Sequence, residues 1–387
     1  AGSLDDPPDK HGLASFTIDV MERGSTRRTF AQLYEEVEGI GASFGLNSGS
    51  HTMYFGAKSL SEHMPHLLDI LQDVLRNPSF NPEHVEKTRA EILADIQERS
   101  NSTHRMASLE FYQLAYPENH PYHWSQLGYE SSINRITRED LIHFHQTHIS
   151  PRNSVLVMVG DVDGHQAVDM VSKLFSDWHH TPVQRPDLPV VPRLERRLEK
   201  SILIEDKVQS DVILGWPGPA RAHPEFLPCF LGNTVLGVFG MYGRLGQAVR
   251  EQNGLAYYAY SSISGGLGPG PWRINTGVEP GNVLRVVDIL RDEIRHILEH
   301  PVPEDELEDS RAFLIGSLPM HLETNEGLTQ AIINIERHQM KLDYLREYTE
   351  MIRGISATEV QTALQHWLHP DQFALSIAGP EFGRTIL

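Results

Sequence analysis

The stretch ITREDLIHFHQTHISPRNSVLVMVG, at residues 136–160, decides the fold because a second version of it occurs later in the chain. Residues 355–379 read ISATEVQTALQHWLHPDQFALSIAG, and one constant offset places Ile136 on Ile355 and Pro151 on Pro370. Each version contains a run with helical period, then a proline, then an apolar run that favours a strand. The first version predicts a helix over residues 137–148 and a buried strand over residues 154–159.

Two further segments repeat in the same way. DILQDVL at residues 69–75 matches DILRDEI at 288–294 with the offset that aligns the prolines, and EKTRAEIL at 86–93 matches EDSRAFLI at 308–315 with a slightly larger one. This agreement in spacing indicates two copies of one domain. Because strand pairs and long helices occupy separate runs, we expect an α+β fold of two tandem homologous domains, each a mainly antiparallel sheet packed by helices.

The predicted boundary between the copies is a change in composition near the middle of the chain. Residues 181–200 hold four prolines and the charged run LERRLEK, which is typical of an extended, semi-rigid linker. We therefore divide the chain into a first domain at residues 1–180, this linker, and a second domain at residues 201–387.

Periodicity predicts the elements of both copies. The first copy should hold a strand pair within residues 42–57 and helices at 12–23, 29–39, 61–75, 81–99, 106–115, 137–148 and 166–175. The second should hold strands near Ile202 and Val212, a strand pair, a strand at 374–378, and helices at 283–298, 304–317, 326–348 and 358–368.

Composition argues against several classes of function. The chain of 387 residues has 33 basic and 52 acidic side chains, and its net charge of −19 disfavours binding to nucleic acid or to anionic membranes. No apolar run approaches membrane-spanning length. The single cysteine, Cys229, excludes an internal disulfide framework and a cysteine-based zinc site.

Residues 243–261, GRLGQAVREQNGLAYYAYS, place Arg250 and Tyr257 at the junction of a predicted helix and strand. A guanidinium group offers a fixed fork of donors and a phenol offers one more, so the pair can bind a carbonyl or an oxyanion. The alternative on spacing alone is an arginine in a surface salt bridge and a tyrosine that caps the core.

Residues 12–26, GLASFTIDVMERGST, resemble the zinc helix of the pitrilysin, insulinase and mitochondrial-processing-peptidase family. In that family a Gly-Leu-Ala segment leads into His-x-x-Glu-His, whose histidines share one helical face and bind zinc while the glutamate activates water. Here the histidine positions are Ser15 and Asp19, and the glutamate position is Ile18. Isoleucine cannot accept a proton, so the resemblance implies a degenerate member that is inactive by itself.

The family's third zinc ligand comes from a later helix, and the resemblance places it at Asp95, with a second glutamate of that helix at Thr88. A serine and two aspartates without an imidazole do not reproduce a tetrahedral zinc site. We therefore expect no metal in this chain. A hard cation held by Asp19 and Asp95 is the alternative, but two carboxylates are few for calcium or magnesium.

The resemblance covers nearly the whole chain. Residues 119–162 are similar to the end of the family's first domain, and residues 231–266 to the signature of its second. The family's glycine-rich run before Arg-Leu is altered to GVFGMYG at residues 237–243. The family's first domain also opens with two strands before its Gly-Ser segment, so the resemblance implies that an N-terminal piece is missing from this sequence.

The family's second-domain arginine and tyrosine bind substrate near the zinc-bound water, and they match Arg250 and Tyr257. In two-chain bacterial members one subunit carries the zinc helix, and a homologous partner without it supplies this pair. The resemblance thus implies a non-catalytic subunit of a zinc-metallopeptidase heterodimer. It would bind peptide substrate and supply both side chains to the active site of a zinc-bearing partner.

Two other functions remain open. A structural or binding protein of this fold, like the core subunits of the respiratory cytochrome complex, would have no peptidase role. A hydrolase with an unrecognised metal set would act alone. We expect a cytoplasmic location, and the periplasm stays open because the true N-terminus is not seen.

Overall fold

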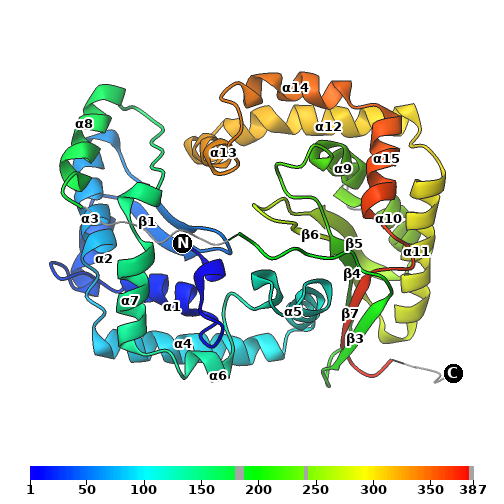
Figure 1. Cartoon of the computed structure of the whole chain (residues 1–387), viewed down its shortest axis with the longest axis horizontal. Coiled ribbons are helices and arrows are strands. Elements are labelled where there is room, and N and C mark those ends of the chain that lie inside the picture. Colours follow the sequence, from blue (N-terminus) through cyan, green and yellow to red (C-terminus); the bar gives the residue numbers. More distant parts are fainter. Residues whose placement is uncertain (179–186, 239–242, 383–387) are drawn as a thin grey trace. The chain divides into compact units, whose positions relative to one another are not determined.

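The computed structural model describes residues 1–178, 187–238 and 243–382, and the chain divides into two compact units (Figure 1). Unit 1 consists of Ala1–Glu98, Trp124–Asp187 and Leu328–Ile333, and unit 2 of Arg99–His123, Leu188–Gly327 and Asn334–Leu387. The predicted α+β fold is confirmed. Residues 99–123 belong to the second compact unit although they precede the predicted linker, and part of that linker lies outside the described residues.

Unit 1 contains a small antiparallel sheet and a set of helices. Strands β1 (Ser43–Ser48) and β2 (Met53–Lys58) pair with Ser43 opposite Lys58, as the polar turn between them predicts. The helices are α1 (Leu13–Met21), α2 (Phe30–Gly39), α3 (Met64–Arg76), α4 (Pro82–Ser100), α6 (Glu130–Ile133), α7 (Arg138–His148) and α8 (Gly164–Phe175). Single 3₁₀ turns lie at Ser3–Asp5, Ser61–His63 and Pro151–Asn153.

Capping explains where two of these helices begin. The Thr29 hydroxyl accepts a hydrogen bond from the Gln32 backbone N–H, and the Gln32 side chain accepts one from the Thr29 N–H, which caps α2. Thr137 and Asp140 form the same reciprocal pair at the start of α7. The unit 1 core then forms from apolar side chains of α1, α4 and α7, among them Leu13, Phe16, Val20, Met21, Ile92, Leu141 and Phe144.

Residues 154–159 do not form the buried strand that their apolar run predicts, so that prediction is wrong. Val155 and Leu156 are 59% and 46% exposed, and the segment pairs with no strand among the described residues. The matching segment of the second copy, β7 (Ala374–Gly379), is buried between two neighbours. A strand needs partners for its backbone N–H and C=O groups, and an apolar run does not show whether those partners are present.

Unit 2 is built on a sheet with the strand order β3-β7-β4-β6-β5. Strands β3 and β7 are parallel, and the other neighbours are antiparallel. Along β4 the side chains of Val212, Leu214 and Trp216 alternate into the main core. The strands other than β7 are β3 (Leu198–Leu203), β4 (Ser210–Pro217), β5 (Ala256–Ile263) and β6 (Pro271–Val278).

Helices cover both faces of this sheet (Figure 1). Helix α5 (Thr103–Ala115) packs on β3, β4 and β7, and a β-carbon added to Gly215 of β4 would lie 3.0 Å from Phe111 Cε2. Other helices are α9 (Phe226–Asn233), α10 (Arg244–Gly246), α11 (Val283–Glu299), α12 (Glu304–Leu322), α13 (Asn325–Arg337), α14 (Tyr344–Gly354) and α15 (Ala357–Trp367), with π-helical turns η5 (Thr234–Val238) and η6 (Gln247–Glu251) and 3₁₀ turns Pro121–His123 and Pro280–Asn282. None of the helices in the described ranges is long and apolar enough to span a membrane.

The single helix predicted over residues 326–348 is wrong, because α13 and α14 are separate helices. Gln339, between them, has a φ of 51°, and the Met340 N–H donates to the Ile335 carbonyl, which closes the end of α13. A left-handed residue at a helix end is usually glycine or asparagine, so a glutamine gives no signal in the sequence.

A buried ion network joins the loop before α2 to helix α3. Arg28 donates from Nη1 to Asp73 at 2.9 Å and from Nη2 to Asp69 at 2.6 Å, and the Ser25 hydroxyl donates to Asp73 at 2.5 Å. Asp73 is fully buried. The matching residue of the second copy, Asp292, has a side chain that is 72% exposed. A carboxylate in the position of Asp73 therefore depends on these donors, and the donors depend on it.

We predict that Asp73→Ala lowers the free energy of unfolding by about 3 kcal/mol, because it leaves Arg28 buried without one of its carboxylates. Asp292→Ala is the matched control and should change it by less than about 0.5 kcal/mol. Urea unfolding followed by circular dichroism measures both. Equal losses for the two variants would contradict the importance of the network.

Candidate functional site

Helix α1 carries the degenerate motif positions Ser15, Ile18 and Asp19, and the carboxylate of Asp6 holds the start of this helix in place. Its oxygens accept hydrogen bonds from the backbone N–H of Gly12 at 2.7 Å and of Ala14 at 2.8 Å. Gly12 has a φ of 96°, and a β-carbon there would lie 2.9 Å from the Leu127 carbonyl oxygen. Burial raises the pKa of Asp6 to about 8, although the two N–H donors act in the opposite direction. The glycine that opens the motif is thus required by backbone geometry.

Packing closes most of the surface of α1. Ser15 and Asp19 are its partly exposed residues, and their spacing of four places them on one face of the helix. Ile18, in the position of the family's base, is fully buried in the apolar interior. Water therefore has no access to the side chain at this position, and the side chain carries no group that accepts a proton.

Asp19 lies in a mainly acidic environment. Burial, together with the neighbouring Glu22 and Glu91, raises its pKa to about 6, while Arg23 acts in the opposite direction. The Arg23 guanidinium also donates to Glu91 at 2.5 Å, so this cation is shared with helix α4. Burial and the neighbouring carboxylates therefore favour the protonated form of Asp19 at mildly acidic pH.

The positions expected on α4 do not complete a metal site. Thr88 is 2% exposed and its hydroxyl makes no hydrogen bond in the described part of the chain, while Asp95 is partly exposed. Within residues 1–178, 187–238 and 243–382, no three or more His, Cys, Asp or Glu side chains are grouped to hold a metal ion. A hydroxyl and carboxylates without imidazole or thiolate do not fit a tetrahedral zinc ion.

Arg250 lies on the π-helical turn η6, directly after α10. Ala248 and Val249 bury the apolar side of this turn, whereas the side chain of Arg250 is 43% exposed. Gly254, with a φ of 64°, ends the turn and donates its N–H to the Arg250 carbonyl at 2.9 Å. The nearest carboxylate oxygen in an ion pair with Arg250 belongs to the adjacent Glu251, at 4.0 Å from Nε. An exposed contact of that length contributes little, so the guanidinium is available to a ligand.

Tyr257 lies at a β-bulge near the start of β5. Ala256 pairs with Val278 and Tyr258 with Gly277, so the register skips Tyr257. Its side chain is 66% exposed, which overturns the interpretation of this tyrosine as a cap on the core. A bulge inserts one residue into a strand and re-aims its side chain, and bulges are frequent beside active sites. π-helical turns are likewise frequent at functional sites, so both side chains lie on irregular backbone.

A buried polar cluster that the sequence did not reveal anchors the same strand. The Tyr258 hydroxyl and the Thr103 hydroxyl donate to Asp211, and His104 Nδ1 lies 3.7 Å from the same carboxylate. Burial acts to raise the pKa of Asp211, but the nearby His104 and the hydrogen bonds from Thr103 and Tyr258 outweigh it and hold the pKa below its usual range. The only signal was an aspartate inside the apolar run SDVILGWP. The cluster holds the side chain of Tyr258, the residue directly after Tyr257, in place.

Comparison with protein families gives two consecutive matches. Residues 1–121 match the model described as insulinase (peptidase family M16), and residues 135–314 match the peptidase M16 inactive domain. An uncharacterized zinc protease of Streptomyces coelicolor is 28% identical over 389 residues, which span 98% of this chain and 83% of that protein. Another, from Rickettsia bellii, is 26% identical over 363 residues, which span 94% and 86%.

Solved structures show the same fold. A peptidase M16 inactive domain from Pseudomonas fluorescens superposes with a TM-score of 0.92 at 23% identity, covering 100% of this chain and 92% of that one. A protease from Helicobacter pylori superposes with a TM-score of 0.88 at 17% identity, covering 98% and 92%.

We predict that the purified chain retains far less than one zinc ion after dialysis, since Ser15 and Asp19 provide no imidazole. The triple variant Ser15→His, Asp19→His, Asp95→Glu should approach one zinc ion per chain. Elemental analysis by mass spectrometry measures both. Stoichiometric zinc in the unaltered chain would contradict the prediction.

Proposed function

Because this chain belongs to the M16 peptidase family, we propose that it is the non-catalytic subunit of a zinc-metallopeptidase heterodimer. In this proposal it binds peptide substrate together with a homologous zinc-bearing partner and supplies Arg250 and Tyr257 to that partner's active site. The observation that carries the proposal is the contrast between the two sites. The metal positions on α1 hold no suitable ligands, while Arg250 and Tyr257 are exposed on a π-turn and a bulge.

The chemistry of the pair suits peptide hydrolysis. A zinc ion in the partner would polarise the scissile carbonyl and activate water. The Tyr257 hydroxyl can donate a hydrogen bond to the oxygen that becomes negatively charged in the transition state. The Arg250 guanidinium can bind a neighbouring peptide carbonyl or carboxylate through two donors. Both groups act only on a substrate that another subunit holds, so the isolated chain is proposed to be inactive.

Irregular backbone supports this assignment. A bulge and a π-turn give up regular ladder or helical bonds, and such departures persist where the surroundings enforce them. Here the Asp211 cluster fixes Tyr258, and the Gly254 N–H completes the end of the Arg250 turn. The structure thus holds the backbone of both residues, while their side chains remain exposed.

The remaining features of the proposal follow from composition. A net charge of −19 suits a partner or peptide with basic groups and disfavours nucleic acid. We propose the cytoplasm as the compartment, with which the lone buried thiol of Cys229 is compatible.

Reconstitution with the zinc-bearing homologue from the same organism tests the proposal. The mixture should hydrolyse an unstructured peptide, and either Arg250→Ala or Tyr257→Phe should lower kcat/KM by about 100-fold, as loss of an oxyanion donor does. Tyr260→Phe is the matched control, since this tyrosine lies on the same strand and is 37% exposed.

Equal activity of all four mixtures would remove the proposed role of the pair. If the chain co-purifies with a non-peptidase assembly and gives no activity with the zinc-bearing homologue, the alternative of a structural or binding protein would be correct.

A further inference from the structure

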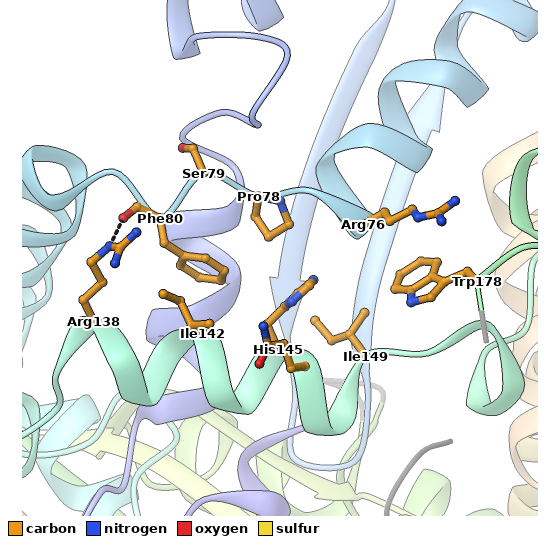
Figure 2. Close-up of a pocket in the computed structure, with 10 residues that line it drawn as sticks. Arg76, Pro78, Ser79, Phe80, Arg138, Ile142, His145, Ile149 and Trp178 are labelled. Atoms are coloured by element: carbon orange, nitrogen blue, oxygen red, sulfur yellow. Dashed lines mark hydrogen bonds between the residues drawn. The ribbon is translucent and has the colours of Figure 1, made fainter. Parts of the chain in front are cut away.

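A pocket of about 510 Å³ lies in unit 1 between helix α7 and the loop that joins α3 to α4 (Figure 2). Phe80, Ile142, Ile149 and Trp178 give it apolar walls. Its volume falls in the range of small-ligand sites, which combine apolar walls with a few polar groups. No aspartate or glutamate of the described residues lines it. The site therefore favours an apolar group and disfavours a cationic one.

Two arginines contribute to the pocket, and they differ in how they are paired. Arg76 donates from both terminal nitrogens to Asp177, at 2.7 and 3.0 Å, so its charge is compensated. Arg138 donates only from Nε, to the Phe80 carbonyl at 2.6 Å (Figure 2). Within the described part of the chain its two terminal nitrogens have no hydrogen bond or ion pair. This end of the pocket thus presents an uncompensated guanidinium fork.

The backbone beside Arg138 is strained. Phe80 has a φ of 43°, a left-handed conformation that bulky side chains rarely adopt. Figure 2 shows its ring at the Arg138 end of the pocket, near Ile142. The Phe80 ring also meets the ring of buried His145 edge to face at 5.8 Å. Strain of this kind is maintained by its surroundings and is concentrated at ligand sites.

The second copy shows that the fold does not require this pocket. The offset that places Pro151 on Pro370 also places Arg138 on Ala357 and His145 on Leu364. Leu364 is fully buried and joins the continuous apolar core of unit 2. The first copy therefore has an arginine and a histidine on this helix at positions where the second copy has apolar residues.

We propose that this pocket binds the C-terminal residue of a peptide, with its apolar side chain between Phe80 and Trp178 and its carboxylate on Arg138. The planar fork of a guanidinium matches the two oxygens of a carboxylate. A free amino acid carries an ammonium group, for which the lining offers no carboxylate, whereas a peptide presents the same end without that charge. This site is separate from Arg250 and Tyr257, and its failure would leave the proposed partner role untouched.

Fluorescence anisotropy with the labelled peptide Gly-Ser-Gly-Ser-Gly-Phe tests the proposal on the full chain. The free acid should bind at least about tenfold more tightly than the C-terminal amide, as expected when a charged hydrogen-bonding group is lost. Free phenylalanine at the same concentration should not displace the peptide. Displacement by it would assign the pocket to amino acids and overturn the peptide assignment.

Arg138→Gln should abolish the preference for the acid, while Arg135→Gln removes an equal charge from an exposed position three residues earlier and should leave binding unchanged. Ile142→Trp should reduce binding by filling the pocket, and thermal melts report whether each variant is folded. Equal binding of acid and amide, no binding at millimolar peptide, or equal behaviour of the two arginine variants would overturn the proposal.

Discussion

The burial of helix α1 is the constraint on which the rest of the first unit depends. Leu13, Phe16, Val20 and Met21 of this helix form a large part of the unit 1 core, so the helix cannot be lost without the domain. The family's chemistry on this helix depends on different positions: the ligand positions are Ser15 and Asp19, and the base position, Ile18, lies in the interior. Packing and catalysis are therefore separable on one helix. A chain without histidine ligands on this helix can keep the glycine, the Asp6 cap and the apolar face that place the helix, because each of them serves the fold.

The second unit shows the opposite relation between packing and chemistry. Arg250 and Tyr257 contribute little to the core, since their side chains are exposed. Nevertheless, the turn that carries Arg250 is π-helical, and Tyr257 interrupts the register of β5. Regular structure at these positions would satisfy the backbone equally well, so the irregularity has no evident benefit for stability. The irregular backbone at both residues therefore supports the proposal that they bind a ligand.

Much of this architecture follows from local sequence, and the failures have a common physical origin. Helical period predicted most helices of unit 1, and the repeat predicted two α+β domains. The prediction of a strand at residues 154–159 was wrong because strand pairing depends on distant segments, about which a local apolar run gives no information. The break between α13 and α14 was not predicted because the left-handed residue there is Gln339, and not the glycine or asparagine that usually marks a helix end. The bulge at Tyr257 and the partners of Asp211 also depend on contacts between segments that are distant in the sequence. The residues of the pair could therefore be named from the sequence, but the exposure of their side chains could not be predicted.

The duplication separates what the fold requires from what it permits. Positions that are filled by apolar side chains in one copy and by polar ones in the other, such as Leu364 and His145, cannot owe their polar character to the architecture. Asp73 and Asp292 are a different case, because both copies have an aspartate, which is buried with Arg28 in the first copy and exposed on the matching helix of the second. Asp73 has a structural explanation because its donors are all within unit 1. Arg138 is explained only in part, since its Nε donates to the Phe80 carbonyl while its terminal nitrogens engage no group of the described chain. In a duplicated protein, a polar side chain that replaces an apolar one and keeps donor groups without an internal partner is therefore where an external ligand should be sought.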